Sequence, residues 1–336
     1  MLEKTTEKSR KSITMDKPIV SHRSGAQKAS SQDSSAKGPM ADRKEKGHPS
    51  HRGRRISQKI IFILLRLAAV INGLALAIII FFLIKNGWQA INWTFLTQAP
   101  RESMTAGGIL PCIVGTLCLA LSAIVIALPI GVASAVYLHE YARPGRVLRI
   151  IRLGINNLAG VPSVIFGLFG LAFFVTWLKF GVSILAGALT LGALSLPVII
   201  SASEEALRSV SQTYREASLA LGATKWQTIY KVVLPAALPG ILTGAILGLS
   251  RAAGETAPIM FTAAVFFSPN LPTSIFDKIM ALPYHIYVLA TAGTEIEKTR
   301  HLQYGTALVL IILVLGLNLC AIIYRSRLRR RMHLGR

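Results

Sequence analysis

The sequence predicts an all-α polytopic membrane protein with about six transmembrane helices. Hydrophobic residues make up 52% of the 336-residue chain, and the mean hydropathy is +0.52. Soluble domains usually contain roughly 45–50% apolar residues. From Lys59 onward, long apolar runs alternate with short charged stretches. Because a run of about 18 residues can cross a bilayer core of roughly 30 Å, one soluble core could not absorb several of them.

Residues 1–58 precede the first apolar run and are rich in Ser, Lys, Arg and Gly. They contain too few large apolar side chains to offset the entropy lost on ordering, so we expect a disordered, basic cytoplasmic tail. Alternatively, this tail lies on anionic lipid, where each Lys or Arg contributes about 1 kcal/mol. The first apolar run begins near Ile60, too deep for a cleavable signal, and is expected to remain as the first span.

A transmembrane domain is expected over 59–326, followed by a basic cytoplasmic tail at 327–336. Pro and Gly occur inside several of its apolar segments, which membrane helices tolerate when neighbouring groups satisfy the freed backbone. The six predicted spans are 60–84, 109–138, 156–177, 182–203, 238–266 and 304–324.

The basic residues beside these spans predict the orientation of the chain. Lys and Arg are concentrated in the links 139–154 and 204–237 and from Arg325 to the C-terminus, whereas the other links are poorer in them. By the positive-inside rule, the basic segments and both termini are cytoplasmic. This pattern accounts for the net charge of +22. We therefore expect membrane lipid, and no nucleic acid, as a partner.

A polar insert at 212–235 lies between two apolar segments and is predicted to form a helix, a break and a second helix. Residues 212–221 are good helix formers, and Gly222 can adopt the left-handed conformation that ends a helix. Thr224 and Gln227 then have the spacing of a capping box, with Thr224 as the N-cap.

The second short helix of this insert is expected to present one apolar face. Trp226, Ile229 and Tyr230 stand at positions i, i+3 and i+4, which share a side of a helix. A short amphipathic helix outside the membrane suits a groove on a partner protein. An ordinary cytoplasmic loop is the alternative interpretation.

The spacing within the insert resembles the EAA signature of ABC-importer permeases. Glu216-Ala217-Ser218 is followed by three residues, Gly222, nine residues and then Val232-Val233-Leu234-Pro235. The departures are Ser218 for Ala and Val232 for Ile. The resemblance implies a type I ABC importer permease fold and an insert that docks into an ATP-binding subunit. It assigns to this coupling surface Glu216, Ala217, Ser218, Gly222, Trp226, Leu234 and Pro235.

A charged pair interrupts the fifth apolar segment. Arg251 and Glu255 are four residues apart, so they are expected on one helix face. Charges at bilayer depth cost at least about 2.5–3.5 kcal/mol each, which means that they pair with each other or face a cavity. Arg suits an oxyanion because its planar fork bonds two oxygens, and Gly254 would let a ligand approach closely. A purely structural salt bridge is the alternative.

The segment from Arg251 to Pro258 resembles the RAxGETAP block of phosphate ABC-transporter permeases. Within that family, the Ala257-Pro258 ending and the Leu282-Pro283 region favour the PstA-type subunit over its PstC-type partner. Tyr137-Leu138-His139-Glu140-Tyr141 and Ala159-Gly160-Val161-Pro162-Ser163 also fit that family. The resemblance covers about 60–330. It implies that the phosphate path is lined by Arg251, Gly254, Glu255 and Thr256.

The resemblance implies a subunit of an ATP-driven phosphate importer in the bacterial inner membrane. Its implied partners are a second, PstC-type permease, two ATP-binding subunits and a periplasmic phosphate-binding protein. The chain has no GxxxxGK[ST] phosphate-binding loop, so ATP and Mg are expected on the partner, and we expect no cofactor, metal or catalytic residue here. A permease for another oxyanion, such as sulfate or molybdate, and an autonomous secondary transporter are the alternatives.

Overall fold

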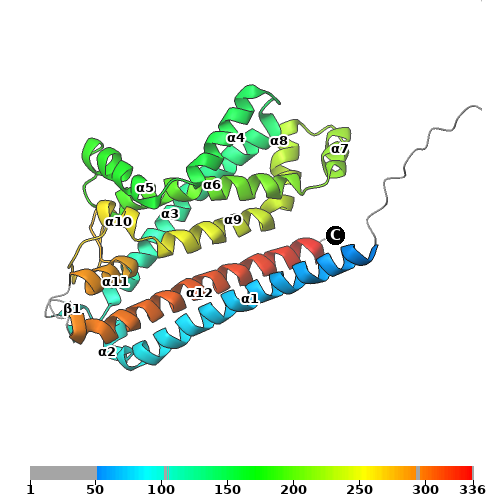
Figure 1. Ribbon diagram of the computed structural model, residues 1–336. Helices are drawn as coiled ribbons and strands as arrows, with labels where there is room; N and C mark the ends of the chain where they lie inside the picture. The colour runs from blue at the N-terminus through cyan, green and yellow to red at the C-terminus, as the bar shows by residue number, and fades with distance from the viewer. Residues whose placement is uncertain (1–50, 102–103, 105, 293–295, 335–336) are drawn as a thin grey trace, which may run out of the picture. The chain divides into compact units, whose positions relative to one another are not determined.

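The computed structural model describes residues 51–101, 104, 106–292 and 296–334, most of them helical (Figure 1). The chain divides into two units, Met1–Ile63 and Leu64–Arg336. In the first unit the described part is the start of helix α1 (His51–Gly87), which begins earlier than expected. Residues 1–50 of the predicted tail lie outside the described residues.

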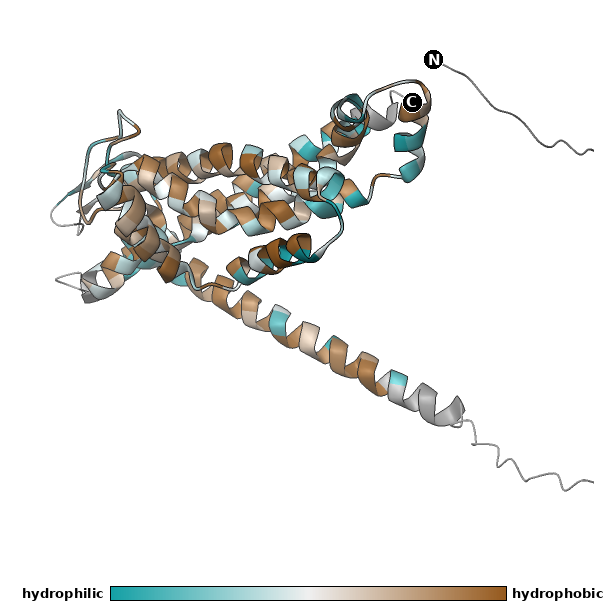
Figure 2. Cartoon of the chain, turned by 90° about the horizontal axis from the view of Figure 1, so that it is seen from above, coloured by the Kyte–Doolittle hydropathy of each residue, from teal (hydrophilic) through white to brown (hydrophobic). Residues whose placement is uncertain are grey.

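Five helical segments are long and apolar enough to cross a membrane, and they overlap five of the six predicted spans. The fifth segment is Lys225–Gly254 and not 238–266, because the helix ends at Gly254. Figure 2 shows that these helices are hydrophobic along most of their length, whereas hydrophilic residues gather at one end of the unit. Helices continue through Pro129 and Pro197, as expected. The main helices of these segments are α1, α3 (Leu110–Val136), α6 (Ile184–Arg208), α9 (Leu234–Gly254) and α12 (Ile296–Leu334).

The prediction of one continuous span over 156–177 is wrong. The structure has α4 (Arg146–Ala159), then α5 (Ser163–Gly170) continued by the π-helical η4 (Leu171–Trp177), with a bend of 99° between the two arms. Pro162 lies at the bend, with φ −56° and ψ 137°. A proline disfavours helical conformation in the residue before it, so α4 ends there. A sixth crossing exists if this bent pair forms one span.

Helix α6 is the centre of the core and packs against both α3 and α9. Small residues bring α6 and α9 close together. A Cβ added at Gly240 would lie 2.5 Å from the Cβ of Ala206, and one at Gly244 would lie 2.7 Å from that of Ala202. Both helices thus present small residues four positions apart, the spacing that allows close packing of membrane helices.

The shorter elements form two groups. At one end, Phe95, Ile109, Met280, Leu289 and Val309 share a buried cluster that joins α2, α3, α11 and α12. This end contains η1 (Trp88–Ala90), α2 (Trp93–Thr97), the antiparallel strands β1 (Pro100–Arg101) and β2 (Ala106–Gly107), α10 (Ala257–Thr262) and α11 (Leu282–Thr291). The other group contains η3 (Tyr137–Tyr141), α7 (Gln212–Ala220), α8 (Lys225–Thr228) and η5 (Ile229–Val233).

Candidate functional site

The polar insert has the helix–turn–helix geometry that its sequence predicts. Gly222 lies between α7 and α8 with φ +83°. The capping box is present: Thr224 Oγ1 accepts from the Gln227 N–H at 3.3 Å, and the Thr224 N–H donates to Gln227 Oε1 at 2.9 Å. A hydrogen bond of 2.9 Å between the Ser218 and Thr228 hydroxyls ties the two helices together.

The apolar face that the sequence predicts over α8 and η5 is divided between buried and exposed residues. Ile229 is only 2% exposed, whereas Trp226 and Tyr230 are 62% and 60% exposed and stack with ring centroids 6.2 Å apart. The expectation of one shared face was therefore wrong. Leu221, which sequence reasoning missed, is 89% exposed beside the turn. We call Leu221, Trp226 and Tyr230 the coupling tip.

The remaining predicted coupling residues differ in exposure. Glu216 and Ala217 are exposed on α7, and Pro235 is exposed at the start of α9. Leu234 instead packs against the buried cluster that includes Val233. The insert therefore has one surface open to a partner and one surface anchored in the transmembrane helices.

An ion pair anchors this insert to η3, the segment that directly follows α3. Arg215 Nη2 lies 3.0 Å from Glu140 Oε1, and the two side chains are only 13% and 10% exposed. Arg215 also donates to the carbonyls of Leu207 at 2.9 Å and Val210 at 2.7 Å, at the end of α6. Lys225 of α8 donates to the Glu140 carbonyl oxygen. One carboxylate and its backbone thus hold both helices of the insert.

Neighbouring charges show that this arrangement is particular to Arg215. Arg208, which lies seven residues before Arg215, is 62% exposed and lies 4.0 Å from Glu205, which is 76% exposed. A second partly buried pair, Arg152 with Glu204 at 3.1 Å, joins α4 to α6. No local pattern marks Glu140 as the partner of Arg215, since 75 residues separate them. The sequence pointed to Glu140 only through the family resemblance of the Tyr137–Tyr141 segment, which contains it.

The predicted pair at the end of α9 is present. Arg251 Nε lies 3.3 Å from Glu255 Oε1, and the two side chains are 32% and 18% exposed. The expectation that both residues lie on one helix face was wrong, because α9 ends at Gly254 and Glu255 is extended with φ −75° and ψ 134°. Two residues, Glu255 and Thr256, separate α9 from α10.

This break leaves room beside the pair. A Cβ added at Gly254 would meet no atom within 4 Å, so packing within the chain does not require glycine there. Non-helical backbone at membrane depth occurs where protein buries it or where it lines a water-filled cavity. The partly exposed Arg251 side chain can therefore reach an anion as well as Glu255. Among the described residues, no group of three His, Cys, Asp or Glu side chains could hold a metal ion.

The long apolar helices and the polar helical insert between α6 and α9 together define the class of multi-pass membrane permease subunits. The chain belongs to the family of binding-protein-dependent transport system inner membrane components, which matches residues 127–334. It is a multi-pass inner-membrane protein. It is 38% identical over 290 residues to the phosphate transport system permease protein PstA 1 of Mycobacterium tuberculosis, covering 84% of this chain and 91% of the relative.

Other relatives agree with this assignment. The chain is 34% identical over 279 residues to the probable ABC transporter permease protein YqgI of Bacillus subtilis, covering 80% of this chain and 95% of the relative. Among solved structures, the bacterial alginate ABC transporter resembles it with a TM-score of 0.54 at 16% identity, covering 83% and 97% of the two chains. The fold is therefore that of an ABC importer permease.

Proposed function

We propose that this chain is a membrane-spanning subunit of an ATP-driven phosphate importer. The observation that carries the proposal is the exposed coupling tip anchored, through Arg215 and Glu140, to transmembrane helices. Such a geometry transmits movement from a docked partner to the helices. Relatives named as phosphate transport permeases, at 33–38% identity, support phosphate as the substrate.

The coupling tip would dock into a groove on an ATP-binding subunit. Trp and Tyr side chains near the centre of an interface are typical binding hot spots, and Trp226 and Tyr230 are 62% and 60% exposed. ATP and Mg would be bound by that partner, so this chain would carry no ATPase activity. ATP binding would draw two such elements together and rock the helices between inward and outward access.

The phosphate path would include Arg251, Gly254, Glu255 and Thr256. In this proposal Arg251 exchanges part of its interaction with Glu255 for the oxygens of phosphate, because a guanidinium can bond two oxygens at once. Glu255 keeps the empty site neutral, which lowers the cost of a charge at membrane depth. Sulfate or molybdate could use the same arginine chemistry.

The full transporter would contain a second, PstC-type permease, two ATP-binding subunits and a periplasmic phosphate-binding protein. The coupling insert and both termini would lie in the cytoplasm. Support for this orientation comes from the basic residues of the 139–154 and 204–237 links and of the end of α12, since cytoplasmic segments are enriched in Lys and Arg.

Uptake of radiolabelled phosphate by cells that lack this chain, complemented with the wild-type gene, tests the proposed substrate. We expect uptake to be restored and to resist an excess of sulfate or molybdate. Restoration of sulfate or molybdate uptake alone would assign another oxyanion. A return of phosphate uptake to normal without the chain's ATP-binding partners would instead indicate a secondary transporter.

A further inference from the structure

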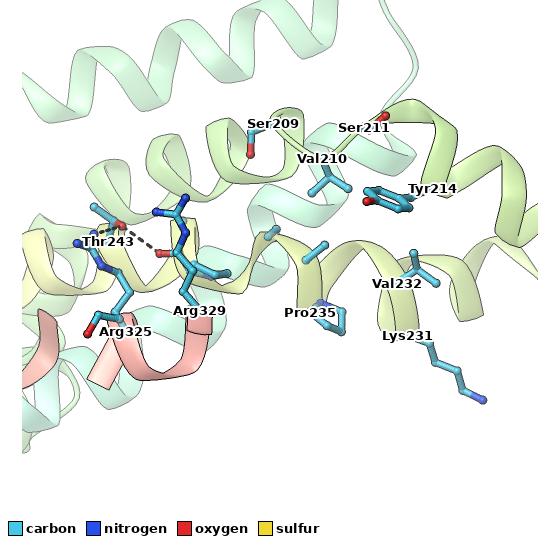
Figure 3. A pocket seen from close by; sticks show the side chains of 15 residues that line it. Ser209, Val210, Ser211, Tyr214, Lys231, Val232, Pro235, Thr243, Arg325 and Arg329 are labelled. Carbon is cyan, nitrogen blue, oxygen red and sulfur yellow. Dashed lines mark hydrogen bonds between the residues drawn. The ribbon is translucent and has the colours of Figure 1, made fainter. Parts of the chain in front are cut away.

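A pocket of about 910 Å³ lies apart from both sites described above (Figure 3). It is formed by the end of α6, the turn into α7, the start of α9 and the end of α12, and we call it the α12 pocket. Neither the Arg251–Glu255 pair nor any residue of the coupling tip lines it. Its contents therefore do not follow from the transport path or from docking through the tip.

The lining of the α12 pocket is positively charged. It includes Lys231, Arg325 and Arg329, and no acidic residue. Arg325 and Arg329 are four positions apart on α12, so they share a helix face and repel each other. Among the residues that the structure describes, neither forms an ion pair with a carboxylate. An anion between them would relieve this repulsion.

One of the two arginines is held in place by a short chain of hydrogen bonds. Arg325 Nη1 donates to Thr243 Oγ1 at 2.7 Å, and this hydroxyl donates to the Pro239 carbonyl at 3.0 Å. Figure 3 shows both bonds, with Arg329 extending from the next turn of α12 toward the same space. The Arg325 guanidinium is thus oriented before any ligand arrives, which reduces the entropy lost on binding.

The rest of the lining combines apolar residues, among them Val210, Val232, Pro235 and Ala237, with the hydroxyl side chains of Ser209, Ser211 and Ser326. The pocket also lies near the end of the candidate span Thr299–Arg330, where a membrane helix reaches the head-group region. A cationic site with apolar walls at that depth suits a phosphate group attached to an apolar body. A freely soluble anion would use only the cationic part.

We propose that the α12 pocket binds the phosphate head group of an anionic phospholipid. Arg325 and Arg329 would contact the phosphate oxygens as charge-assisted donors, and the apolar residues would contact the glycerol and upper acyl region. Lys231 and Pro235 belong to the coupling insert, so the bound lipid would brace the start of α9 against α12. This inference does not depend on which substrate the chain transports.

A pair of matched double variants tests the site in the purified, complete transporter. Arg325→Gln/Arg329→Gln removes the two charges from the pocket, whereas Arg327→Gln/Arg330→Gln removes two charges from the same turn of α12 without touching the lining. Native mass spectrometry then counts bound phosphatidylglycerol, with phosphatidylcholine as the neutral comparison. We expect at least tenfold weaker phosphatidylglycerol binding in the pocket variant and less than threefold in the control.

Arg329→Gln alone is the control for misfolding, because it keeps the hydrogen bond between Arg325 and Thr243. This single variant should reduce phosphatidylglycerol binding severalfold. Equal losses in the two double variants would overturn the proposal, because they would indicate general attraction to basic residues. Equal binding of phosphatidylglycerol and phosphatidylcholine would also overturn it. Inorganic phosphate could instead raise the melting temperature of the wild type but not of the pocket variant, with no preference for phosphatidylglycerol over phosphatidylcholine. That result would overturn the lipid proposal and assign the pocket to a soluble phosphate.

Discussion

Replacing Arg215 with Gln should loosen the coupling insert from the transmembrane helices. At the observed separation of 3.0 Å, the gross attraction between the two charges is about 5.5 kcal/mol at an effective dielectric constant of roughly 20. Desolvation offsets much of this, but Arg215→Gln leaves Glu140 only 10% exposed and without its cation. Breaking one side of such a pair costs about 3 kcal/mol.

Hydrogen–deuterium exchange of the 212–233 segment, measured in the assembled transporter, reports this loss directly. A change of about 3 kcal/mol corresponds to a fall in protection on the order of 100-fold. Arg208→Gln is the matched control, because its pair with Glu205 is exposed at 4.0 Å and exposed pairs contribute about 0–1 kcal/mol. Phosphate uptake should fall in the Arg215 variant and stay near normal in the control.

The double variant Arg215→Gln/Glu140→Gln distinguishes the ion pair from the arginine's hydrogen bonds to α6. Because neither residue then leaves a buried charge unpaired, its loss of protection should be smaller than the sum of the two single losses. Equal protection from hydrogen exchange in the Arg215 and Arg208 single variants would mean that the Arg215–Glu140 pair does not hold the insert in place. So would simple additivity in the double variant, since it would mean that the two side chains do not interact.

Three further changes test other parts of the structure. Gly222→Val should weaken co-purification of the ATP-binding subunit, because the φ of +83° at this position costs a residue with a side chain about 1–2 kcal/mol. Gly222→Asn should retain the ATP-binding subunit, and equal co-purification with both variants would contradict this prediction. Arg251→Ala should abolish phosphate uptake while the complex still assembles, and near-normal uptake would remove Arg251 from the path. Burial lowers the pKa of His285 to about 4, so the free energy of unfolding should fall by up to about 3 kcal/mol as pH falls from 6.5 to 4. The melting temperature of His285→Leu should not show this part of the pH dependence.

Sequence patterns predicted the features that depend on neighbouring residues. Five apolar runs became long helices because hydrophobicity and length alone decide whether a segment can cross a membrane. Gly222 and the Thr224–Gln227 capping box were also predictable, since each is a local arrangement of backbone and side chain. The Arg251–Glu255 contact followed from charges placed four residues apart in an apolar setting.

The features that depend on distant packing were not predictable. The 99° bend at Pro162 changes the direction of a segment whose hydropathy still resembles one span. Ile229 is buried while Trp226 is exposed because packing against the transmembrane helices, together with the wider π-helical turn from Ile229 to Val233, sets which side faces inward. The partner of Arg215 is 75 residues away, so no local spacing identifies Glu140.

Reconstitution into proteoliposomes shows whether the chain imports phosphate as a subunit of an ATP-driven transporter. The chain would be assembled with its second permease and its binding protein, with and without the ATP-binding subunits, and uptake of radiolabelled phosphate would be measured after ATP is supplied on the side of the coupling tip. We expect uptake only when the ATP-binding subunits and ATP are both present. Phosphate uptake of the same rate without those subunits would contradict this expectation.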